Sequence, residues 1–217
     1  MTVINNLFKM LMLISAVAAS VELLRLTQRK KFETLLFISL IFSIVDIISN
    51  YIFLDFIKSD KMFASFANIN QYVFYLFEIL SIIFFYSELN GRRSNTKNTI
   101  IIIAISIATT FLLFTISKID WTFLTLTLVI VFELLFINFS FGYFFTKNLE
   151  VEYSSRTNRL VIINYGLFIF VNFTTPFYFV NIYLLKHNIE VPDLNFITYI
   201  GYIILYSTII KSSKWKI

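Results

Sequence analysis

The sequence predicts an all-α integral membrane protein, in which residues 1–217 form a single domain that is a seven-transmembrane-helix bundle. Three observations lead to this prediction. Seven apolar segments are each long enough to cross the hydrocarbon core of a bilayer, which takes about 20 helical residues. Only 14% of the residues are charged, against about 25% in a soluble domain. The breaks between the segments are short and polar, such as RLTQRKK (25–31) and NGRRSNTK (90–97).

The predicted spans follow one another with little chain between them. A helix pairs every backbone amide within its own segment, which lipid requires. In chain order the spans are about 3–24, 32–57, 63–87, 98–117, 121–146, 158–185 and 194–213.

Individual spans carry further signals. The first contains Lys9 and lacks a small-residue cleavage site, so we interpret it as a retained helix and not a signal peptide. The fifth begins at Trp121, and Trp215 follows the seventh, where interfacial aromatic anchors are expected. The sixth contains Pro176, which is tolerated in a membrane helix when neighbours satisfy the freed carbonyl.

The distribution of basic residues predicts the orientation. Thirteen of the 18 Lys and Arg residues lie after the first, third and fifth spans and in the tail KSSKWKI, and five lie on the other side. Basic residues near span ends are retained in the cytoplasm. We therefore expect the N-terminus outside and the C-terminus in the cytoplasm of a multi-pass protein of the bacterial cytoplasmic (inner) membrane.

Three acids lie near the centres of their predicted spans, namely Asp46, Glu78 and Glu133. Each costs a few kcal/mol at the middle of a bilayer, and such residues commonly mark functional sites. We expect no Lys, Arg or His at the same depth. A fourth acid, Glu22, lies within one helical turn of Arg25, which we expect to neutralise it.

Polar residues share helical faces with these acids. Ser43 and Asn50 lie on the same helical face as Asp46. Gln71 and Tyr75 lie on the same helical face as Glu78. Asn164 and Asn172 mark a comparable face of the sixth span. Because such faces are costly against lipid, we expect them to turn toward a shared interior.

Two interpretations of the acids remain open. In the structural one, each is neutral and donates a hydrogen bond to an Asn or Tyr, which positions helices. In the functional one, the three form a site for a proton, a cation or a metal ion whose identity the sequence does not specify.

Several function classes lack the residues that they need. There is no cysteine and one histidine, His187, so zinc chemistry is implausible, and no catalytic residue or cofactor is expected. The phosphate-binding glycine-rich loop and the His-Glu-x-x-His motif are absent. The basic residues are dispersed among loops, which excludes nucleic-acid binding. We therefore expect a protein that is not an enzyme.

Three stretches, ANINQYVFYLFEILSIIFFYSEL (67–89), NYGLFIFVNFTTPFYFV (164–180) and LNFITYIGYIILYSTIIKSSKW (194–215), resemble those of small, uncharacterised seven-span bacterial membrane proteins. The resemblance covers about a third of the chain and implies a recurring bundle without transferring any binding or catalytic residue.

Two functions are compatible with these features. The first is a small transporter or channel whose buried acids handle a proton or cation. The alternative is a membrane sensor, effector or accessory subunit, for example in stress or phage defence, that acts through a protein partner. Besides the lipid bilayer, the expected partners are such a protein or further copies of the chain.

Overall fold

The computed structural model describes residues 2–26, 31–52, 61–90, 100–109, 121–147, 155–186 and 195–213. All of these residues except the two that end the first range belong to helices. The helices are α1 (Thr2–Leu24), α2 (Lys31–Ile52), α4 (Lys61–Asn90), Ile100–Thr109, α6 (Trp121–Lys147), α7 (Ser155–Lys186) and α8 (Asn195–Ser213).

Each described helix lies within or around one of the predicted spans, and the all-helical prediction is confirmed. Within the described residues, five helices are long and apolar enough to cross a membrane: Val3–Leu24, Lys31–Ser49, Tyr72–Leu89, Arg159–Asn181 and Phe196–Ser213. Two shorter apolar segments, Ile100–Thr109 and Thr127–Gly142, fall in the other two predicted spans. The multi-pass character is therefore supported, and seven crossings stay a prediction.

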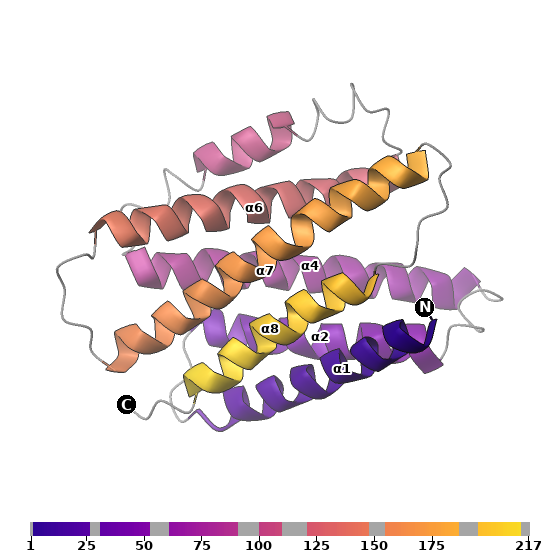
Figure 1. The fold of residues 1–217 in the computed structure, drawn as a ribbon, viewed down its shortest axis with the longest axis horizontal. Helices are drawn as coiled ribbons and strands as arrows, with labels where there is room; N and C mark the ends of the chain where they lie inside the picture. The colour runs from indigo at the N-terminus through magenta and orange to yellow at the C-terminus, as the bar shows by residue number, and fades with distance from the viewer. Residues whose placement is uncertain are drawn as a thin grey trace.

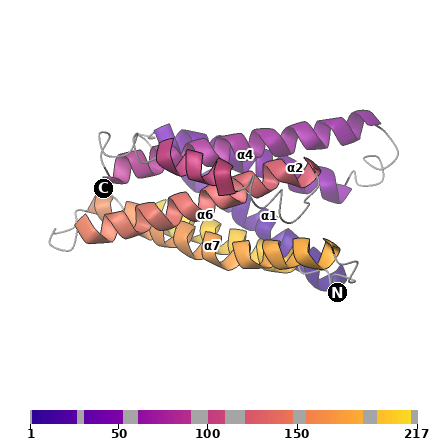
Figure 2. The same ribbon diagram turned by 90° about the horizontal axis from the view of Figure 1, so that it is seen from above.

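Six helices form a closed ring in chain order. α1 packs on α2, α2 on α4, α4 on α6, α6 on α7, α7 on α8, and α8 returns to α1. The Ile100–Thr109 helix lies at the edge of the bundle beside α6 (Figure 1). Helices α4 and α6 run nearly parallel to each other, and α7 and α8 are inclined to them (Figure 1), while α1 is inclined in the perpendicular view (Figure 2). Because the ring closes, the inward faces of all six helices surround a common interior.

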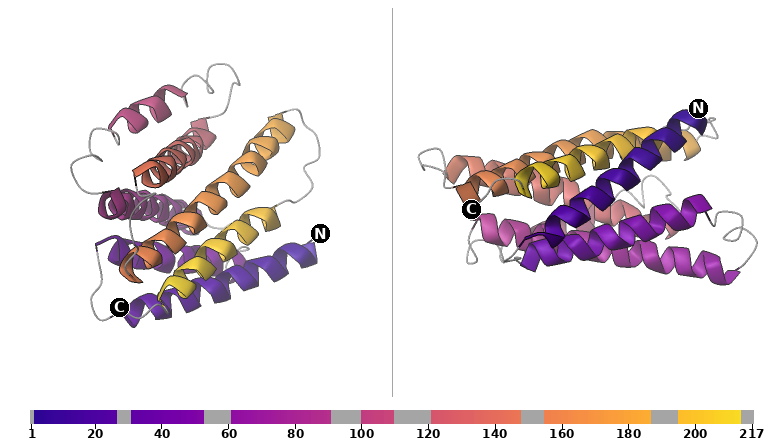
Figure 3. Two further views of the ribbon diagram at one scale, coloured as in Figure 1. Left: turned by 60° about the vertical axis from the view of Figure 1, so that its left-hand side comes forward. Right: turned by 90° about the horizontal axis from the view of Figure 1, so that it is seen from below.

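Helix α1 joins the two sides of the ring. It crosses obliquely between a layer of α2 and α4 and a layer of α7 and α8 (Figure 3). Near the start of α8, the Phe196 amide donates a hydrogen bond of 2.9 Å to Asn5 Oδ1 of α1. Near its end, the Ser213 hydroxyl donates to Glu22 Oε2 at 3.3 Å. The first bond satisfies one of the amides that a helix start leaves unpaired, and the two bonds together fix α1 against α8.

The outer surface of the described helices is apolar. Large hydrophobic side chains are exposed along several of them, for example Val3 at 80%, Ile69 and Ile100 at 62%, and Tyr183 at 59%. Soluble monomers rarely expose such extensive apolar surface. Polar side chains are instead buried inside, which is the distribution expected of a bundle that lipid surrounds.

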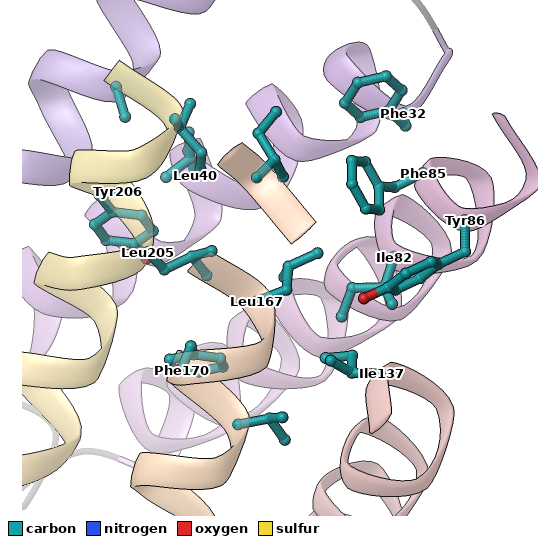
Figure 4. Close-up of a cluster of buried hydrophobic side chains, with 14 of the residues drawn as sticks. Phe32, Leu40, Ile82, Phe85, Tyr86, Ile137, Leu167, Phe170, Leu205 and Tyr206 are labelled. Atoms are coloured by element: carbon teal, nitrogen blue, oxygen red, sulfur yellow. The ribbon is translucent and has the colours of Figure 1, made fainter. Parts of the chain in front are cut away.

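Apolar side chains fill the half of the bundle in which α1 ends and α2 begins. Phe32, Phe85, Tyr86 and Leu167 pack together there (Figure 4), with Phe32 and Phe85 ring centroids 5.4 Å apart in an edge-to-face contact. Tyr86 is fully buried and makes a similar contact with Phe136. We call the cluster of Phe32, Phe85, Tyr86, Phe136 and Leu167 the apolar plug.

Two ion pairs lie at the same end of the bundle as the plug. The predicted neutralisation of Glu22 is confirmed, because Arg25 Nη1 lies 2.9 Å from its Oε1. The second pair was not predicted: Arg159 Nη2 lies 2.5 Å from Glu33 Oε1, and both side chains are buried. We counted the basic residues after the fifth span only as topological anchors. One of them, Arg159, lies in α7 and pairs with Glu33 at the start of α2.

The start of α1 and the end of α8 lie at opposite ends of the bundle (Figure 1). With the orientation that the basic residues predict, the end of α8 faces the cytoplasm. A protease-sensitive tag after Ile217 is therefore expected to survive protease added outside intact cells, whereas a tag before Met1 is removed. Detergent-opened cells, in which both tags are cleaved, provide the control. Cleavage of the C-terminal tag in intact cells would refute the orientation.

Candidate functional site: an acidic cavity inside the helix ring

The ring encloses a cavity of about 430 Å³ to which all six of its helices contribute. Its lining includes Lys9 from α1 and Thr198 from α8, both near the starts of their helices. The cavity therefore lies toward the end of the bundle at which α1 begins. The apolar plug occupies the other half, and Phe170 belongs to both the cavity lining and the apolar core.

All three predicted central acids line this cavity. Asp46 comes from α2, Glu78 from α4 and Glu133 from α6. Glu78 is 7% exposed and Glu133 is 6% exposed, and the two carboxyl groups are close enough to interact electrostatically. The acid-bearing faces of α2, α4 and α6 thus meet inside the ring. Whether they bind a proton or cation stays a prediction.

Among the three acids, Glu133 has a carboxyl oxygen whose hydrogen-bonding capacity the described residues do not satisfy. Its Oε1 atom is fully buried and has no hydrogen-bond partner within the described part of the chain. Leaving a buried polar atom without a partner costs about 1–3 kcal/mol, and more for a charged group. Buried polar atoms in folded proteins are nearly always paired, and an exception calls for an explanation such as a bound water or ion.

One expectation about the acids is wrong. Lys9 lines the same cavity as Asp46, Glu78 and Glu133, so a basic residue does lie at their level. We counted Lys9 with the basic residues of the outer side, although it lies within the first predicted span. In the structure Lys9 of α1 lines the cavity inside the ring. Three carboxyl groups and one amine therefore line the cavity, which leaves an excess of acidic groups.

Aromatic side chains form much of the remaining wall. Tyr202 of α8 lies between Phe170 and Phe74, with ring centroids 4.6 Å and 6.3 Å away. Its ring also lies 5.7 Å from that of Tyr206, whose hydroxyl is 3.1 Å from Ser43 Oγ. Of the supporting polar residues predicted from sequence, Ser43 and Tyr75 line the cavity.

The two predicted asparagines of α7 do not line the cavity. Asn164 is buried beside the apolar plug, where its Oδ1 accepts a hydrogen bond of 2.7 Å from the Tyr86 hydroxyl. Asn172 is exposed on the outside, so the expectation that it turns inward is wrong. Asn172 and Asn138 exchange amide hydrogen bonds of 3.1 Å and 3.3 Å across the α6–α7 seam.

A physical reason explains why this Asn pair can face outward. Asn138 Nδ2 also donates to the Leu134 carbonyl, and Asn172 Nδ2 to that of Phe168. Each amide therefore donates twice and accepts once, so its polar atoms are satisfied without water. Such a closed pair carries a much lower cost at a lipid-facing surface than a single unpaired amide.

Two further predicted residues, Asn50 and Gln71, have side chains that lie outside the described residues. Among the residues that are described, no three His, Cys, Asp or Glu side chains are grouped closely enough to hold one metal ion. The three acids thus line one cavity without forming a compact cage for a metal ion.

Sequence reasoning missed several cavity residues. Lys9 had a signal, because it is the only charged residue between positions 1 and 21. Others had none: Thr174, Tyr178, Thr198, Tyr199 and Tyr202 line the cavity, but Thr and Tyr are too frequent in this chain for one to be singled out.

No protein-family model, curated protein or solved structure matches this chain.

Proposed function

We propose that this chain is a multi-pass protein of the bacterial cytoplasmic membrane that moves a proton or a cation through the acidic cavity, as a small transporter. The observation that carries the proposal is the presence of Asp46, Glu78 and Glu133 in the lining of one cavity, together with the single amine of Lys9. Ionisable groups are costly within a bilayer and mark ion or proton pathways.

The position of the cavity favours a transporter over an open channel. The cavity lies in the half of the bundle that we expect to face outward, and the apolar plug fills the other half. Phe85, Tyr86 and Phe136 of that half are at most 2% exposed, so a continuous hydrated path is blocked there. A cavity in one half of the bundle and a packed region in the other half are compatible with alternating access.

The proposal is tested by flux into proteoliposomes that contain the purified full chain. An imposed membrane potential should drive uptake of a proton, read with an internal pH dye, or of a cation, read as uptake of the labelled ion. Glu78→Gln removes a cavity carboxylate with almost no change in volume, and we expect it to reduce this flux at least about tenfold. Glu88→Gln is the control, because Glu88 is an exposed acid on the same helix that does not line the cavity.

Full flux in Glu78→Gln would remove Glu78 from any transport role. Absence of flux in the unmodified chain for protons, sodium and organic ammonium ions alike would refute the proposal. Circular dichroism and gel filtration in detergent establish that each variant is folded before its flux is compared.

The partner-dependent function is the second candidate, and one exposed apolar helix is compatible with it. The Ile100–Thr109 helix lies at the edge of the bundle with Ile100, Ile101 and Ile107 about half or more exposed. This apolar ridge fits either lipid or an apolar helix of a partner. A folded chain without flux that co-purifies from native membranes with one stoichiometric protein would support this second function.

A further inference from the structure

We infer that the cargo of the acidic cavity is an organic ammonium ion, whose charged head the carboxylates neutralise and whose apolar substituents contact aromatic side chains. This inference rests on the proposed function and specifies the class of cation. Three properties of the cavity support it: its volume, the dispersal of its acids and the nature of its wall.

Volume and geometry argue against a bare metal ion. A cavity of about 430 Å³ falls within the range of roughly 300–1,000 Å³ that small-molecule sites occupy. A metal ion needs several oxygen atoms converging at about 2.0–2.6 Å. In the described part of the chain the acids are not grouped in this way. The carboxylates are distributed around a space large enough for a molecule.

The wall has the composition that recognises alkylated ammonium groups. Six aromatic side chains line the cavity together with the acids: Phe74, Tyr75, Phe170, Tyr178, Tyr199 and Tyr202. A cation near an aromatic face gains about 0.5–1 kcal/mol when exposed and about 2 kcal/mol or more when desolvated, and aromatic cages are a common way to bind quaternary ammonium groups. Aromatic side chains also make apolar contacts with the alkyl substituents, which carboxylates alone do not provide.

Charge and burial indicate a cation and not a neutral solute. The cavity holds three carboxyl groups and one amine, so ionisation of all four leaves two negative charges in excess. Glu133 Oε1, buried without a hydrogen-bond partner within the described residues, is the acceptor that this cation is expected to satisfy.

The experiment compares matched ligands on the purified full chain in detergent, by calorimetry and by thermal shift. Choline and benzyltrimethylammonium are the cationic probes. The neutral isostere of choline, 3,3-dimethylbutan-1-ol, isolates the charge, and sodium chloride at equal ionic strength controls for salt. We expect both cations to bind and the neutral isostere to bind at least about tenfold more weakly.

Variants connect this preference to named side chains. Glu133→Gln should weaken choline binding about tenfold, and Glu88→Gln should leave it unchanged. Lys9→Gln should strengthen choline binding, because it removes the like charge. Tyr202→Phe keeps the ring and should retain binding, whereas Tyr202→Leu should weaken it. If Tyr202→Leu does not fold, the ligand comparison on the unmodified chain still decides.

The outcomes separate this inference from the proposed function. Equal binding of choline and its neutral isostere would overturn the inference. Betaine binding more tightly than choline would also overturn it, in favour of a zwitterion whose carboxylate Lys9 holds. Saturable, Glu133-dependent binding of sodium or magnesium without any binding of choline would overturn it while leaving a cation transporter in place. Absence of binding for choline, benzyltrimethylammonium, sodium and magnesium alike would overturn the inference, and proton flux into proteoliposomes would then decide whether the proposed function stands.

Discussion

Replacing Glu33 by methionine is expected to destabilise the folded chain by about 3–5 kcal/mol, because it leaves the buried guanidinium of Arg159 without its carboxylate. Arg159 side-chain exposure is only 8%. An arginine cannot escape this cost by losing its proton, because the guanidinium group stays charged in proteins. Unfolding by titration with SDS in mixed micelles measures the loss.

A double variant and a control define the cause. Glu33→Met combined with Arg159→Met should recover most of the stability, since a buried ion pair is often replaced by apolar residues without net cost. Glu22→Met, which breaks the pair with the 70% exposed Arg25, should cost about 1 kcal/mol or less. A loss of that small size for Glu33→Met would mean that Arg159 reaches water by extending its side chain.

Gly166→Ala is the second substitution with a large expected effect, a loss of about 1–3 kcal/mol from overpacking. A Cβ atom added at Gly166 would overlap the Thr208 hydroxyl and lie 2.9 Å from both Thr208 Cβ and Cγ2. The Thr208 side chain has little freedom to turn away, because it is β-branched and its hydroxyl donates a 2.7 Å bond to the Leu205 carbonyl. The two helices α7 and α8 must therefore move apart.

A second helical glycine, Gly142, provides a control for this substitution. Gly142 is also in a helix, and nothing lies within 4 Å of a Cβ added there. Gly142→Ala should therefore gain up to about 1 kcal/mol from helix propensity, opposite in sign to Gly166→Ala. Thr208→Ala in the Gly166→Ala background should restore part of the loss. Equal effects at the two glycines would show that α7 and α8 do not depend on close approach at Gly166.

The helices were largely predictable, because hydropathy along a segment reports local transfer from water into lipid. The predicted span 158–185 corresponds to α7, and 194–213 to α8, within a few residues. The burial of Glu78 and Glu133 also follows from a local argument, since a carboxyl group at that depth has few alternatives to the interior.

Asn172 shows where the local argument fails. Its polar character predicts an inward position, yet it lies outside because Asn138 on a neighbouring helix completes its hydrogen bonds. Such a partner lies on another helix, and one chain read in order does not reveal which helix becomes the neighbour. The same holds for Glu33 and Arg159, whose α2 and α7 are far apart in the sequence.

By itself the sequence determined the medium that surrounds this protein, the positions of its helices and the acids that must leave the lipid, because each depends on the transfer energy of a short segment. Only the tertiary structure decided that α8 returns to α1, that Lys9 joins the three acids and that aromatic side chains complete the cavity wall. Those features depend on helix neighbours and on rotation about each helix axis. Both are decided by packing between distant segments, such as Gly166 against Thr208.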